Sequence, residues 1–105
     1  MDMRKMMKQA QKMQLELARA QEEIKDFTYT ATAGGGMVSV TAKGENTIES
    51  VVINPEAVDP DDVEMLQDMV LAAVNDALTG VSEQSEARMS NVTAGMKGMN
   101  IPGLM

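Results

Sequence analysis

The chain has 105 residues and a net charge of −7, from nine basic and sixteen acidic residues. It contains no cysteine and no histidine, which removes disulfides, thiol chemistry, the usual general base and the commonest metal ligand. No motif has catalytic spacing, so we expect no enzyme activity, no metal and no cofactor. No stretch is apolar over the length of a bilayer, so we expect a cytoplasmic protein without membrane contact.

The first predicted element is an amphipathic helix over residues 1–25. At about 100° per residue, one arc of roughly 100° collects the basic residues Arg4, Lys5, Lys8, Lys12 and Arg19. The opposite face is an apolar stripe with heptad-like spacing, formed by Met3, Met6, Ala10, Met13, Leu17, Ala20 and Ile24. Such a stripe favours packing against a partner helix or sheet, and we assign Met6, Ala10, Met13, Leu17 and Ile24 to a dimer seam.

Three strands are predicted within residues 27–53. Apolar and polar residues alternate over residues 27–32 and again over residues 38–42, which is the period of a half-buried strand. The glycines at 34–36 break the chain between these runs, and residues 43–46 form a turn in which Gly44 can take positive φ. In the third strand Val51 and Val52 break the alternation, so either both faces are covered there or a bulge intervenes. The short connections predict an antiparallel meander.

A second long helix is predicted over residues 60–93. Asp59 is a good N-cap, Pro60 suits the first turn, and Val58 and Val63 are spaced for a hydrophobic staple. Gly80 is expected to weaken the helix. One apolar face contains Val63, Leu66, Val70, Ala73, Val74, Ala77 and Val81. We therefore predict one α+β domain over residues 1–94, in the order α-β-β-β-α, followed by a flexible tail rich in glycine and methionine at residues 95–105.

Several segments together resemble the YbaB/EbfC family of bacterial nucleoid-associated proteins. The resemblance is carried by residues 33–40 (AGGGMVSV), 51–56 (VVINPE), 71–78 (LAAVNDAL) and 101–104 (IPGL), and by the opening Met6, Met7, Lys8, Gln9, Ala10 and Met13. It implies an intertwined, tweezer-like homodimer with a three-stranded antiparallel sheet in each subunit. It also implies binding to duplex DNA with weak sequence preference, association with the nucleoid, and an influence on nucleoid organisation and gene expression.

This chain departs from the family pattern in its second helix. Family members commonly carry lysines in the outer part of that helix, whereas residues 79–87 here contain no basic residue. Arg88 and Lys97 are the basic residues that follow.

Two function classes remain open from the residues alone. The first is a structural protein that contacts duplex phosphates through Arg4, Lys5, Lys8, Lys12, Arg19 and Arg88. The second is an accessory module for recombination or replication proteins, whose acidic surface meets a basic partner. The plain alternative for the basic arc is a solvated helix face. The glycines at 34–36 lack the residues of a phosphate loop, and the acidic group Asp59, Asp61, Asp62 and Glu64 is explained by helix capping without a cation.

Overall fold

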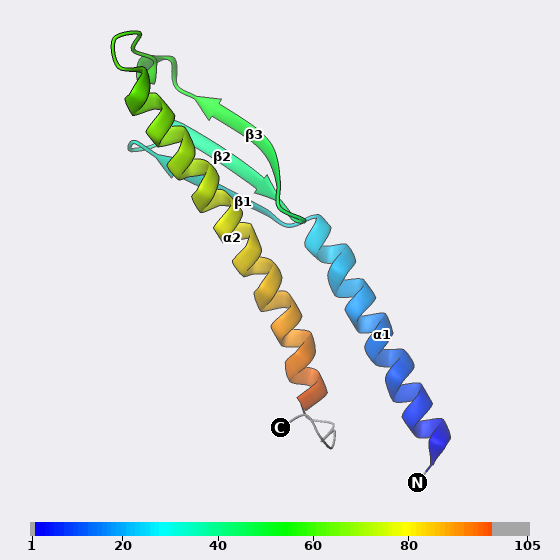
Figure 1. Ribbon diagram of the computed structural model, residues 1–105. Helices are drawn as coiled ribbons and strands as arrows, with labels where there is room; N and C mark the ends of the chain where they lie inside the picture. The colour runs from blue at the N-terminus through cyan, green and yellow to red at the C-terminus, as the bar shows by residue number, and fades with distance from the viewer. Residues whose placement is uncertain (1, 98–105) are drawn as a thin grey trace.

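The computed structural model describes residues 2–97 and places two long helices beside a small sheet (Figure 1). The elements follow in the order α1 (Met3–Lys25), β1 (Thr28–Ala33), β2 (Val38–Lys43), β3 (Thr47–Ile53), the 3-10 helix η1 (Pro55–Ala57) and α2 (Val63–Lys97). This confirms the predicted α+β order. Within residues 2–97, no helix combines the length and the apolar character that crossing a membrane requires.

α1 has defined caps at both ends. The Asp2 carboxylate accepts a hydrogen bond from the Arg4 N–H at 3.1 Å, so the helix begins at Met3. At the other end the Asp26 N–H donates to the Glu23 carbonyl at 3.0 Å and closes the last turn. The helix therefore ends where the sequence predicted, at Lys25.

The three strands form one antiparallel sheet in the order β1-β2-β3, so β1 and β3 are its edges. Between β2 and β3 the register shifts at Thr41 and Ala42, which pair with Ser50 and Ile48 and leave Glu49 without an opposite residue. Of the two explanations offered for the broken alternation at Val51 and Val52, the structure therefore supports a bulge. The extra residue shifts the following part of β3 by one position, which changes the face of the sheet on which each later side chain lies.

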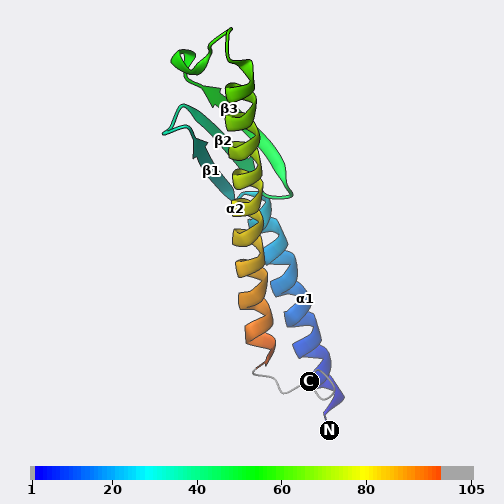
Figure 2. The ribbon, with the colours of Figure 1, turned by 60° about the vertical axis from the view of Figure 1, so that its left-hand side comes forward.

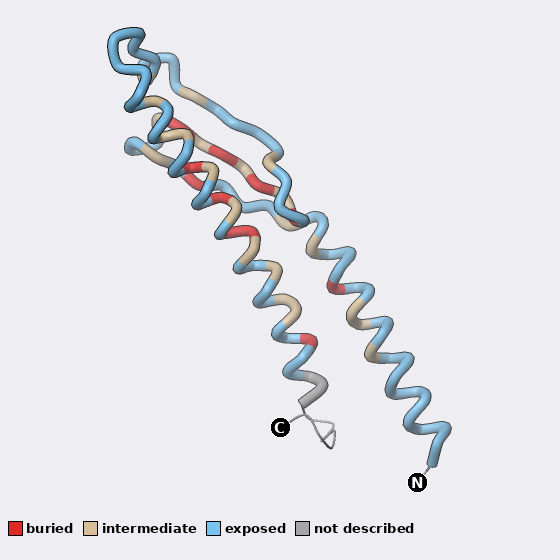
Figure 3. The backbone as a smooth tube through the Cα atoms, viewed as in Figure 1, coloured by how far each residue is buried: buried red, intermediate tan, exposed pale blue. Residues whose placement is uncertain are grey.

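The core lies between one face of the sheet and α2, and it is built from small side chains. α2 packs over β1 and β2 and makes little contact with β3. The central cluster consists of Ala31, Val38, Val40, Ala42, Ala73, Ala77 and Val81. Figure 3 shows these buried positions as a band along β2 and the facing side of α2. With valine as the largest fully buried side chain, the core gains less apolar burial than one filled with leucine or phenylalanine.

α2 begins three residues later than predicted. The Asp59 carboxylate accepts from the Asp61 N–H at 2.9 Å, and it thereby closes a tight turn before the helix. Asp62 is the residue whose carboxylate accepts from an N–H of the first turn, that of Met65 at 3.2 Å. With Asp62 as the cap, Val58 and Val63 do not occupy the N′ and N4 positions of a hydrophobic staple, and both are more than half exposed, so the staple predicted from Asp59 does not apply. The helix then continues through Gly80 to Lys97, and residues 98–105 of the predicted tail lie outside the described part of the chain.

Positive φ angles in the β2–β3 turn fall on Glu45 and Asn46, not on Gly44 as predicted. Gly44 is required for a different reason. A Cβ built there would overlap the carbonyl of Ile24 at the end of α1. The turn therefore packs directly against the backbone of α1, and only a residue without a side chain allows that approach.

The molecule is strongly elongated. Its principal extents are 73 × 25 × 15 Å and its radius of gyration is 20.4 Å, whereas a compact domain of this length has a radius of about 13 Å. Figures 1 and 2 show the cause, since α1 and the second half of α2 extend together away from the sheet. A shape this thin leaves large apolar side chains on the surface.

Candidate nucleic-acid interface

The predicted basic arc lies on the part of the molecule that extends from the sheet. Arg4, Lys5, Lys8, Lys12 and Arg19 are all exposed on α1. The first four lie in the half of α1 nearest the N-terminus, which Figure 1 shows farthest from the sheet. No side chain of these four takes part in a salt bridge among the described residues. This half of α1 therefore presents free positive charge to the solvent.

The second half of α1 is joined to α2. Arg88 Nε donates to Glu23 Oε2 at 2.7 Å, across 65 positions of sequence. This hydrogen bond, together with the charge of Arg88, holds the pKa of Glu23 below its ordinary value. Arg88 is the sixth residue predicted to contact DNA. The structure places it away from the first four, with its charge balanced by Glu23, and its role in DNA binding stays a prediction.

The predicted dimer seam divides into two parts. Met13, Leu17 and Ile24 are half-buried, and Ala20 beside them is fully buried where α1 runs along α2. Met6 is 55% exposed, and Ala10 is also exposed. The C-terminal part of the stripe is thus covered to a large extent within the same chain, and the N-terminal part remains open.

A second apolar surface lies between β3 and α2, and the sequence analysis did not identify it. It is an open groove of about 410 Å³ lined by Ile53, Leu66, Gln67, Val70, Leu71 and Val74. Leu71 is 60% exposed there, and Val51 on the adjoining strand is 46% exposed. At about 100° per residue, the apolar residues of α2 occupy an arc of roughly 200° around the helix. Packing against a single neighbour needs an arc of only about 100°. That width is the signal that could have revealed the groove.

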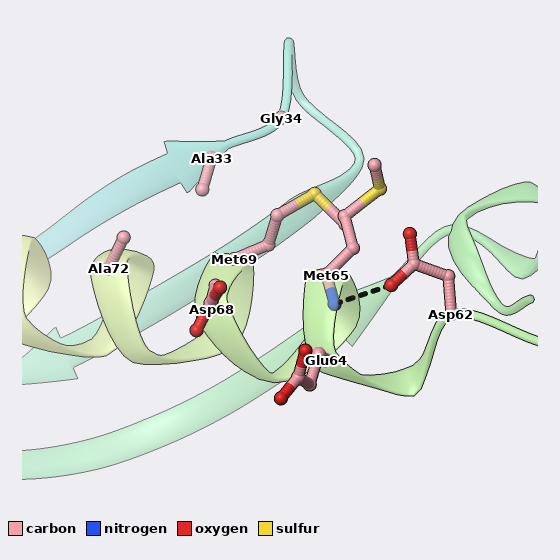
Figure 4. Close-up of a pocket in the computed structure, with 8 residues that line it drawn as sticks. All are labelled: Ala33, Gly34, Asp62, Glu64, Met65, Asp68, Met69 and Ala72. Atoms are coloured by element: carbon pink, nitrogen blue, oxygen red, sulfur yellow. Dashed lines mark hydrogen bonds between the residues drawn. The ribbon is translucent and has the colours of Figure 1, made fainter.

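The acidic residues at the start of α2 serve the helix. Figure 4 shows Asp62 bonded to the Met65 N–H, while the carboxylates of Glu64 and Asp68 point in other directions. Met69 extends toward Gly34 in the loop between β1 and β2. Within the described residues, no three acidic side chains form a group that could hold a metal ion. The arrangement is that of a capped helix end packed against a glycine loop.

Comparison with protein families gives one match that spans almost the whole chain. Residues 1–96 match a model described as the YbaB/EbfC DNA-binding family. The matched range includes α1, the sheet and nearly all of α2.

Individual proteins are similar to this chain over most of its length. A protein from Exiguobacterium sibiricum named nucleoid-associated protein is 57% identical over 103 residues, covering 98% of this chain and 94% of that protein. A protein of the same name from Acetivibrio thermocellus is 54% identical over 99 residues, covering 94% and 86%. The crystal structure of an uncharacterized protein from Helicobacter pylori aligns with a TM-score of 0.69 at 28% identity, covering 89% of this chain and 98% of the other.

Proposed function

The chain belongs to the YbaB/EbfC DNA-binding family, and from this membership we propose that it binds duplex DNA as a homodimer at the nucleoid. The basic faces of the two N-terminal helices are the proposed contact surface, and their contribution to nucleoid organisation and gene expression follows from coating or bridging duplex. The observation that supports this most strongly is the exposed basic group Arg4, Lys5, Lys8 and Lys12, which forms no salt bridge with any residue of the described range 2–97. It lies on an otherwise acidic chain.

The geometry of the basic face favours phosphate contacts. Arg4 and Lys12 are eight residues apart, which is about 12 Å along a helix. Duplex DNA carries one phosphate charge per about 1.7 Å of axis, so several phosphates fall within reach. Contacts to phosphates position a protein without reading bases, which accounts for weak sequence preference. Phe27 and Tyr29, the only aromatic side chains, lie before and within β1 near the sheet, so α1 offers no stacking surface for single strands.

The proposed dimer is supported by the groove between β3 and α2. We infer that a second copy of the chain covers this groove, because its walls are almost entirely apolar and Leu71 and Val51 extend the apolar surface beside it. A core built from alanine and valine gains further burial from such an interface. Dimerisation doubles the basic surface, so two helices act on one duplex or on two.

A salt-titrated mobility-shift assay with duplex DNA tests the proposal. Log affinity should fall linearly with log salt at about −0.9 per phosphate neutralised, which amounts to roughly −7 when four cations of each protomer bind. Replacing Lys8 and Lys12 by glutamine should weaken binding to all duplex sequences alike and reduce the slope by about 3 to 4, since four cations are lost from the dimer.

The matched control carries the same change of charge elsewhere. Lys25→Gln with Lys43→Gln removes two cations per chain from the end of α1 and from the sheet, so its affinity and salt slope should stay close to those of the unmodified protein. If both double variants bind duplex equally well, α1 is not the contact surface.

A further inference from the structure

Among the described residues, no strand pairs with the outer edge of β1. β1 pairs with β2 alone, and the Gly44 N–H donates to the Phe27 carbonyl at 2.8 Å, which marks that pair as hydrogen-bonded. Hydrogen-bonded and non-bonded pairs alternate along an antiparallel ladder. In the register of this sheet, the backbone N–H and C=O groups of Thr28, Thr30 and Thr32 therefore point away from β2, toward the open edge.

This edge lacks the devices that usually protect edge strands. Natural sheets blunt an edge with charged residues, proline or a bulge. β1 has the sequence TYTATA and pairs with β2 without a register shift. The other edge strand, β3, carries Glu49 at its irregular position. The contrast makes β1 the edge on which another strand can add.

The surface beside the open edge is acidic. A groove of about 420 Å³ runs between β1 and α2, with Tyr29 and Thr30 on one side and Asp76 and Glu83 on the other. Asp76 and Glu83 are the charged residues of the groove, both are exposed, and neither forms a salt bridge within the described residues. They lie seven residues apart, about 10 Å along α2, so a strand bound to β1 would run beside two negative charges.

We propose that the β1 edge binds an extended basic segment of a partner protein by β-strand addition. Backbone hydrogen bonds to Thr28, Thr30 and Thr32 would supply affinity, and lysine or arginine at every second residue would place cations about 7 Å apart on the face toward Asp76 and Glu83. A second copy fits this edge poorly, because pairing two β1 strands would bring together two pairs of carboxylates. The same charges repel duplex DNA, so this surface differs from the one proposed for nucleic acid.

The probe is a labelled eight-residue peptide in which lysine alternates with threonine, titrated into the full chain without DNA and followed by fluorescence anisotropy. We expect binding that weakens with added salt, no binding of the matched peptide with glutamate in place of lysine, and slowed amide exchange at Thr28, Thr30 and Thr32. The inference fails if the glutamate peptide binds equally, if those amides are not protected, or if the β1 edges pair with each other.

Variants test the backbone hydrogen bonds of β1 and the acidic side chains of α2 separately. Thr30→Pro removes one outward N–H at an edge position that tolerates proline, and Asp76→Asn with Glu83→Gln removes the charges; each should weaken binding about tenfold. Thr30→Val keeps the N–H, and Glu64→Gln with Asp68→Asn makes the same charge change outside the groove, so both should bind like the parent. Should Thr30→Pro fail to fold, amide exchange and the charge variants decide. Equal binding by the two charge pairs would overturn the inference.

Discussion

At the scale of single residues, Gly80 shows how a contact can override helix propensity. Glycine in a helix interior costs about 1 kcal/mol relative to alanine, yet α2 passes through Gly80 without interruption and the residue is buried. A Cβ built there would lie 2.6 Å from Tyr29 Cγ and would overlap other atoms of the ring. Gly80 therefore provides the space that lets the ring of Tyr29 lie against α2.

Replacing Gly80 by alanine should consequently destabilise the protein by about 1 kcal/mol, because the cost of displacing the ring exceeds the gain in helix propensity. In a Tyr29→Ala background the same change should stabilise it by a similar amount, since the obstacle is gone. Urea unfolding of the four proteins of this double-mutant cycle measures both effects. An effect of the same sign in both backgrounds would show that the ring does not determine the cost.

At the scale of elements, α1 has two halves with different roles. Its second half is tied to α2 through Glu23 and Arg88 and through the buried Ala20. Its first half carries the exposed cations of the proposed DNA surface. The direction in which the basic face points is thus set by contacts two or more turns away from it.

The Glu23–Arg88 pair should give a pH-dependent contribution to stability. Arg88 lowers the pKa of Glu23 below its ordinary value of 4.5, so the contribution is present above that value and is lost as pH falls through the lower pKa of the folded state. Glu23→Gln should therefore melt below the parent at pH 7, by a small margin because Glu23 is exposed to solvent and Arg88 is only half-buried.

Melting curves at pH 7 and pH 3 measure this effect, and the margin should shrink at pH 3. Glu22→Gln is the control, since Glu22 pairs with Lys25 inside α1 and does not link the helices. A margin that is unchanged at pH 3 would assign the effect of Glu23 to something other than its charge.

At the scale of the whole molecule, the elongated shape and the exposed apolar groove have one common explanation. α2 lies over β1 and β2, and α1 extends away from the sheet, so neither helix covers β3 to any large extent. The apolar side of β3 and the adjoining face of α2 then stay open. A second copy covering this groove would complete a core that one chain leaves unfinished.

Leu71→Asp should convert the proposed dimer to a folded monomer, with dimer affinity lowered about a hundredfold or more, because the interface would bury an unpaired charge. Leu71 is 60% exposed in the single chain, so the monomer should keep its secondary structure. Leu15→Asp places the same charge at a leucine 52% exposed on α1 and should remain dimeric. Light scattering at micromolar concentration measures the masses; a folded monomer of the unmodified chain would contradict the dimer itself.

The sequence by itself determined the type and order of the elements, because these depend on neighbours within a few residues. Each of these signals involves only a few neighbouring residues: the heptad spacing of α1, the alternation in β1 and β2, and the glycines at 34–36. The basic face of α1 was predictable for the same reason, since Lys8 and Lys12 share a face of any helix that contains both. The start of α2 shows the limit of this reasoning. Asp59 and Asp62 are both good caps, and the turn that Asp59 closes leaves the capping to Asp62.

Only the tertiary structure decided which apolar and charged residues are covered. Glu23 and Arg88 meet across 65 positions, and no local pattern contains that contact. Leu71 and Val74 both belong to the apolar arc of α2, yet one is exposed and the other half-buried, because the path of α2 over the sheet determines which part of the arc meets β2. The open β1 edge likewise depends on strand order, which leaves β1 and β3 each paired on one side only. Burial, ion pairing and free edges follow from where distant segments come together, and that is a property of the folded chain.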